Sequence, residues 1–210
     1  MVTQERKRTR TLGILAAVLV IAAAFSWHYK FDPWGYYWKC SPEETAIRSR
    51  VIKAAEGYLG YNEYDGSHAT IIDLYNSHEP LAMDYLVKYT DSWCSTFVSA
   101  VAIQANMTEL IPTECGCQRH IELFQKLGVW EERDDIIPLP GDIIFYDWDQ
   151  TSPGECDGWS DHVGIVVGTK WPFIKVIEGN KDDSVSYRIL PIGDTQIRGY
   201  AKPDYGSLLN

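Results

Sequence analysis

The sequence predicts an α+β fold in which N-terminal helices pack on a small antiparallel sheet. Apolar residues recur at helical spacing in the stretch from residue 42 to residue 127, whereas the pattern switches to short strand-like runs after Pro140-Gly141-Asp142. Helices and strands that occupy separate parts of a chain are typical of this fold class. With 210 residues, the chain is long enough to bury a single core of ordinary size.

The first predicted helix runs from Pro42 to about Leu59. Ser41 is suited to cap it, Pro42 occupies the first helical position, and Glu44 completes a capping box. Gly60 ends this helix. Further helices are predicted near residues 70–75, from Cys94 onward, and over residues 119–127.

The second half of the chain is predicted to form strands. Two of them make a hairpin, in which residues 163–167 are followed by a turn over residues 169–172 and then by residues 173–178. Pro140-Gly141-Asp142 is predicted to be the tight turn before the first strand, without a chemical role. The other strands are predicted over residues 143–146, 185–190 and 197–201.

The first 40 residues are predicted to lie outside the folded domain, which occupies residues 41–210. Residues 1–11 form a basic tail. An almost unbroken apolar run with aromatic residues after it predicts a membrane anchor over residues 12–29, and residues 30–40 form an aromatic linker. The alternative is a secretory signal peptide with a cleavage site at Ala22-Ala23-Ala24.

These features predict a single-pass protein of the cell membrane with its domain outside, because arginine and lysine stay on the cytoplasmic side. With a cleaved signal peptide, the protein would be secreted. The chain has a net charge of −10, and since the first ten residues carry +3, the remainder carries −13. An acidic body without a basic stripe argues against nucleic acid as a partner.

Cys94 is the candidate nucleophile. Asp91 or Ser92 can cap the helix whose apolar positions include Phe97 and Val98. Either cap places Cys94 in the first turn, where unpaired N–H groups and the helix dipole favour a thiolate. The carboxylate of Asp91 opposes this effect and leaves the pKa of the thiol open. The structural alternative is a cysteine that acts as a small buried apolar residue.

His162 is the candidate base, and the register of the hairpin decides its partner. One register sets Val167 opposite Phe173, and His162 then faces Glu178. A shift of two residues makes His162 face Asn180 instead. Both side chains can point toward His162 if the chain stays extended through residue 179, whereas a slip of one residue would separate His162 from both.

A thiolate, an imidazole and an orienting carboxylate or amide are the groups that nucleophilic cleavage of an amide requires. Cys94 attacks the carbonyl, His162 accepts and returns the proton, and a third group holds the imidazole. Glu178 is the expected third group and Asn180 a supporting one. Each residue taken singly has a structural alternative, but their joint presence favours catalysis.

Three segments of the chain resemble the CHAP family, the cysteine, histidine-dependent amidohydrolases and peptidases that cut peptidoglycan. They are residues 93–100 around Cys94, residues 161–168 around His162, and residues 177–180. The resemblance covers roughly residues 43–205. It implies a papain-like fold and a peptidoglycan substrate, cut by an N-acetylmuramoyl-L-alanine amidase or a peptide endopeptidase. Residues 83–92 lack the aspartate-rich calcium loop of some CHAP domains, so no metal or other cofactor is expected.

Two other functions stay open: a secreted cysteine peptidase or acyltransferase that acts on proteins, and a wall-binding module without activity. The loop over residues 61–65 is either a substrate contact or an ordinary polar connection.

The remaining cysteines leave their pairing open as well. If they form disulfides among themselves, Cys94 stays free. Cys115-Gly116-Cys117 lacks the two-residue spacing of thioredoxin-like redox motifs, which favours a structural role. The four cysteines in question are Cys40, Cys115, Cys117 and Cys156.

Overall fold

The computed structural model describes residues 40–150, 152, 154 and 158–209. In these residues an antiparallel sheet has the strand order β1-β6-β2-β3-β4-β5, and the predicted α+β class is confirmed. The helices are α2 (Pro42–Glu56), α3 (Ala69–Asn76), α4 (Cys94–Ala105) and α5 (Cys117–Lys126). The strands are β1 (Trp130–Glu131), β2 (Ile143–Tyr146), β3 (His162–Lys170), β4 (Phe173–Lys181), β5 (Ser184–Pro191) and β6 (Ile197–Ala201).

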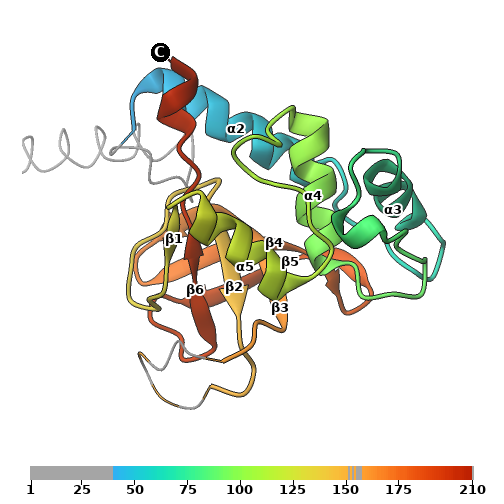
Figure 1. Cartoon of the computed structure of the whole chain (residues 1–210). Coiled ribbons are helices and arrows are strands. Elements are labelled where there is room, and N and C mark those ends of the chain that lie inside the picture. Colours follow the sequence, from blue (N-terminus) through green and yellow to red (C-terminus); the bar gives the residue numbers. More distant parts are fainter. Residues whose placement is uncertain (1–39, 151, 153, 155–157, 210) are drawn as a thin grey trace, which may run out of the picture. The chain divides into compact units, whose positions relative to one another are not determined.

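Helix α4 lies at the centre of the helical layer, between α2 and α3 (Figure 1). It also packs against β3 and β4. The first nine residues of α4 are all buried, and a helix that is apolar on every side belongs inside a core. The helix that begins with the candidate nucleophile is therefore the one most enclosed by the rest of the fold.

The predicted membrane partner and cell-membrane location are corrected here, whereas the predicted anchor over residues 12–29 lies outside the described residues. No helix in the described part of the chain is long and apolar enough to cross a membrane. The longest of them, α2, has 15 residues, whereas a span needs about 20 apolar ones. This finding is the reason why the membrane partner and the cell-membrane location are corrected. Residues 1–39, which include the basic tail and the apolar run, lie outside the described residues.

Helix α2 begins as predicted. The hydroxyl of Ser41 accepts a hydrogen bond from the backbone N–H of Glu44 at 3.1 Å, which caps the helix. Glu44 does not close the predicted capping box, because its carboxylate instead accepts a hydrogen bond from Arg48 Nε at 2.8 Å. The helix ends at Glu56, three residues before the predicted end, and a turn continues the chain.

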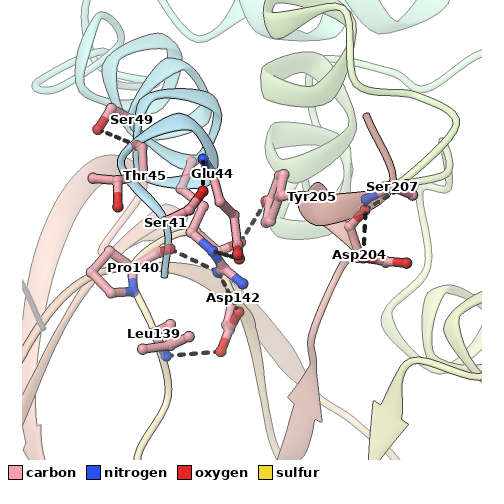
Figure 2. A network of polar contacts seen from close by, with 12 residues as sticks. Ser41, Glu44, Thr45, Ser49, Leu139, Pro140, Asp142, Asp204, Tyr205 and Ser207 are labelled. Atoms are coloured by element: carbon pink, nitrogen blue, oxygen red, sulfur yellow. Dashed lines mark hydrogen bonds and ion pairs between the residues drawn. The ribbon is translucent and has the colours of Figure 1, made fainter. Parts of the chain in front are cut away.

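Arg48 joins α2 to the turn before β2. Figure 2 shows the polar network around Pro140, Asp142 and Tyr205 to which Arg48 belongs. Its Nη1 donates to Asp142 Oδ1 at 2.8 Å and to the Pro140 carbonyl at 3.0 Å. The hydroxyl of Tyr205 donates to the carbonyl of Gly141 at 2.7 Å, which attaches the C-terminal 3-10 turn to the same place. The predicted turn is thus also the site of a buried ion pair. Breaking such a pair typically costs about 3–5 kcal/mol, because it leaves one charge buried alone.

Candidate active site

Cys94 is the first residue of α4, and Trp93 rather than Asp91 or Ser92 is the N-cap residue. The predicted caps are therefore wrong. The carboxylate of Asp91 is engaged outside the helix, where Oδ2 accepts a hydrogen bond from the backbone N–H of Lys88 at 2.8 Å. Cys94 still lies in the first helical turn, where the unpaired N–H groups and the dipole favour a thiolate.

The loop over residues 61–65 supports the start of α4. Trp93 is fully buried, and its indole Nε1 donates a hydrogen bond to Glu63 Oε1 at 2.9 Å. A buried indole N–H needs such a partner. The loop therefore has at least a structural task, which is to hold the residue that precedes Cys94.

His162 and Glu178 lie side by side on β3 and β4. His162 Nε2 is 3.1 Å from Glu178 Oε2, and both residues are buried. With Nε2 bound to Glu178, Nδ1 is the nitrogen left for Cys94, whose side chain interacts electrostatically with the His162 ring. The structure thus brings three of the four predicted site residues together.

The register of the hairpin differs from the first choice made from the sequence. Strand β3 continues to Lys170, inside the predicted turn over residues 169–172, and Lys170 lies opposite Phe173, so the predicted pairing of Val167 with Phe173 is wrong. A bulge at residue 167 then shifts the register by one residue. Ile165 lies opposite Ile177, and counting back from this pair sets position 162 against position 180. The two-residue shift named as the alternative is therefore the one that occurs.

Glu178 still reaches His162, because Gly164 has no side chain that would block its path. A Cβ at residue 164 would lie 2.7 Å from Glu178 Cγ and 3.1 Å from the carbonyl oxygen of Ile177. The Glu178 side chain therefore occupies the space that any larger residue at position 164 would fill, and it extends diagonally to His162. Diagonal neighbours on one face of a sheet are within reach of long side chains.

Asn180 is not placed to orient the imidazole. Its φ is 55°, so the chain does not stay extended at this position, as the prediction required. Its side chain makes no hydrogen bond within the described part of the chain. Asn180 and His162 line the same surface hollow.

Gly179 lets α4 approach β4 closely. A Cβ at this position would lie 2.6 Å from Phe97 Cγ and 3.0 Å from the Trp93 ring. Trp93 and Phe97 flank Cys94 along α4, so their contact with residue 179 sets the separation between the thiol and His162. A side chain here would push the two elements of the site apart.

His162 shifts the pKa values of Cys94 and Glu178, and both of these groups shift the pKa of His162. A hydrogen bond with Cys117 lowers the pKa of Cys94; burial opposes this, and contact with His162 lowers it further, so it lies well below its usual value. Burial disfavours the imidazolium, but hydrogen bonds to Cys94 and Glu178 outweigh burial and raise the pKa of His162 to about 9. Burial also disfavours ionised Glu178, yet hydrogen bonds from His162 and Arg188 hold its pKa below the usual value. These directions favour a thiolate, an imidazolium and a carboxylate in the site.

Arg188, Trp148 and Cys117 also border the site, and their places there were not predicted from the sequence. Arg188 Nε donates to Glu178 Oε1 at 2.7 Å, and its guanidinium carbon lies 5.2 Å from the centre of the Trp148 ring. The alternation of β5 could have identified Arg188, because it shares a sheet face with Glu178. No local pattern marks the other two.

No protein-family model matches the chain, and no curated protein is significantly similar to it. The resemblance to the CHAP family therefore rests on the three sequence segments that contain the thiol, the imidazole and the carboxylate.

Glu178→Gln is expected to lower turnover of an amide substrate by about 10²-fold, within the range of general acid–base contributions. The amide keeps a hydrogen bond but loses the charge that stabilises the imidazolium, so the pKa of His162 should fall from about 9. Kinetics and an NMR titration of His162 measure both effects.

The matched variant is Asn180→Gly, because glycine tolerates the φ of 55° and the change removes only the side chain. Its loss of turnover should be much smaller than that of Glu178→Gln. A larger loss in Asn180→Gly, with the pKa of His162 unmoved by Glu178→Gln, would make the amide the orienting group.

Proposed function

We propose that this protein is a cysteine-dependent amide hydrolase. One observation carries the proposal: a buried histidine lies 3.1 Å from a buried carboxylate and interacts electrostatically with a cysteine at a helix start. These groups and contacts are the ones that nucleophilic cleavage of an amide needs. The raised pKa of His162 and the lowered pKa of Cys94 support an ion pair that is ready to react.

In the first half of the reaction, the Cys94 thiolate attacks the carbonyl carbon of the amide. The tetrahedral intermediate then collapses, the C–N bond breaks, and the imidazolium of His162 gives a proton to the leaving nitrogen. In the second half, water attacks the thioester while His162 accepts its proton, and the carboxylic acid leaves. Glu178 holds Nε2–H and stabilises the imidazolium in each proton transfer.

We further propose that the enzyme is of the CHAP type, with a papain-like fold, and that peptidoglycan is its substrate. The order of the three segments supports this, as does a nucleophile that begins a helix packed on the antiparallel sheet that carries its base. The hollow beside His162 combines an exposed indole with polar groups, which suits a ligand that has sugar and peptide parts. Its other lining residues are Trp148, Asn180, Lys181, Asp182, Arg188 and Gln196.

Digestion of purified peptidoglycan by the full chain tests the proposal, with product masses read by mass spectrometry. New amino termini on L-alanine would identify an N-acetylmuramoyl-L-alanine amidase, whereas separated cross-links would identify a peptide endopeptidase. The Cys94→Ala variant is the blank. Intact peptidoglycan together with cleavage of casein would contradict the wall substrate and favour a peptidase acting on proteins.

A further inference from the structure

A second thiol lies against the proposed nucleophile. Cys117 Sγ is 3.5 Å from Cys94 Sγ, and only 9% and 6% of the two residues are exposed. Cys117 forms no covalent bond in the hydrolytic mechanism. Its pairing with Cys40 or Cys115, left open by the sequence, is not observed, since all of these cysteines are free.

The fold holds Cys117 in this position. Cys117 is the first residue of α5, and the loop before it is fastened to α4 by Ser99, whose hydroxyl donates to the carbonyl of Glu114 at 2.7 Å and accepts from its N–H at 2.8 Å. The Glu114 carboxylate accepts from the N–H groups of Cys115 and Gly116 at 2.7 and 3.0 Å. The loop before α5 is thereby fastened to α4, and this arrangement supports the contact between the sulfurs.

We propose that Cys94 and Cys117 form a site of reversible oxidative modification, at which a hydroperoxide converts the two thiols to a disulfide. The proposal rests on the proposed function only for its consequence, which is that hydrolysis stops while Cys94 is bonded to sulfur. In this proposal the second cysteine of the Cys115-Gly116-Cys117 segment is the thiol that forms the disulfide with Cys94.

The first step, written for hydrogen peroxide, consumes the thiolate. Cys94 Sγ attacks a peroxide oxygen, the O–O bond breaks, and the departing hydroxide takes a proton from His162 to leave as water. Cys94 is then a sulfenic acid. In the second step Cys117 Sγ attacks Cys94 Sγ, the S–O bond breaks, and the hydroxide leaves as water with the proton of the Cys117 thiol. The two thiols lose two electrons in total, and one peroxide is reduced to two waters.

The charges of the pair favour this order. The hydrogen bond to Cys94, followed by burial, raises the pKa of Cys117 well above its usual value, which favours a neutral Cys117 thiol beside a charged Cys94. Oxidation of Cys94 removes that negative charge and with it the main cause of the raised pKa. Cys117 then ionises more readily at the moment when it must attack.

Cys115 provides a matched control. Its sulfur lies 3.7 Å from Arg119 Nη2, and no hydrogen bond joins it to Cys94 in the described part of the chain. It is half-buried and only two residues from Cys117, so a serine there changes the same loop without touching the sulfur pair.

The test treats the reduced full chain with hydrogen peroxide, blocks remaining thiols with N-ethylmaleimide under denaturing conditions, and cleaves after glutamate. Glu109 and Glu114 lie between the cysteines, so Cys94 and Cys117 leave in separate peptides, residues 64–109 and 115–122. We expect these two peptides to be joined in the wild type and in Cys115→Ser, but not in Cys117→Ser. The rate at which iodoacetamide alkylates Cys94 should fall at least about tenfold in the wild type and return with dithiothreitol.

In Cys117→Ser, Cys94 should instead advance to a sulfinic acid that dithiothreitol does not reverse. The proposal is overturned if the wild type forms the sulfinic acid without joined peptides, or if the joined peptides persist in Cys117→Ser. Neither readout uses hydrolysis. Joined peptides in a protein that leaves peptidoglycan intact would therefore contradict the proposed function and leave the disulfide standing.

Discussion

Cys94→Ala is expected to abolish hydrolysis of peptidoglycan, with a loss of at least about 10⁴-fold, since it removes the atom that attacks the carbonyl. The fold should survive the change. Alanine fills most of the space of the thiol, and Cys94 is one small residue in a large core, so the free energy of unfolding should fall by only about 1 kcal/mol. Product release from labelled peptidoglycan and thermal unfolding measure the two effects.

Cys115→Ser is the control for the loss of a thiol near the site, and it should retain hydrolysis because Cys115 does not contact Cys94. If Cys94→Ala unfolds at its normal temperature and still hydrolyses the substrate, Cys94 is not the nucleophile. If both variants lose activity while they remain folded, the assignment of a single attacking thiol fails.

His162→Gln is expected to have the second largest effect, a loss of turnover of about 10²–10⁴-fold, because it removes the general base and acid. It also removes the positive charge that helps to hold Cys94 as a thiolate. Between pH 8 and pH 6, the alkylation rate of an ordinary thiol falls about a hundredfold as its thiolate fraction falls. Alkylation of Cys94 by iodoacetamide should fall far less in the wild type, and approach the ordinary behaviour in His162→Gln.

The pH dependence of the wild type follows from the same ion pair. The pKa of His162 is raised to about 9, so the imidazolium is present below this pH and is lost as the pH rises through it. Hydrolysis should therefore decline above about pH 9, where the leaving nitrogen no longer receives a proton. His78→Gln, a change at a partly exposed histidine outside the site, is the control and should leave this pH profile unchanged.

The alkylation experiment has its own contradicting outcome. Equal alkylation rates in the wild type and His162→Gln at pH 6 would show that Cys94 and His162 do not interact.

Local features of the chain predicted much of the fold. The α+β class, the N-cap at Ser41 and the turn before Ile143 depend on neighbours within a few residues, so periodicity and capping chemistry identify them. The end of the first helix was placed three residues too late, because Gly57 rather than Gly60 is its C-cap residue. The apolar run over residues 12–29 lies outside the described residues, and the membrane location inferred from it is corrected.

The sequence by itself determined which residue types the candidate site contains: a cysteine at a helix start, a histidine at a strand start and a carboxylate on the next strand. Only the tertiary structure decided how they meet. Lys170 rather than Val167 lies opposite Phe173, a bulge at residue 167 shifts the register by one further residue, and Gly164 lets Glu178 reach His162. The contact of Cys117 with Cys94 joins the starts of two helices 23 positions apart in the chain. Helical and strand periodicity indicate which residues are buried along one element. Bulges, positions where only glycine fits, and contacts between elements depend instead on the packing of the whole chain.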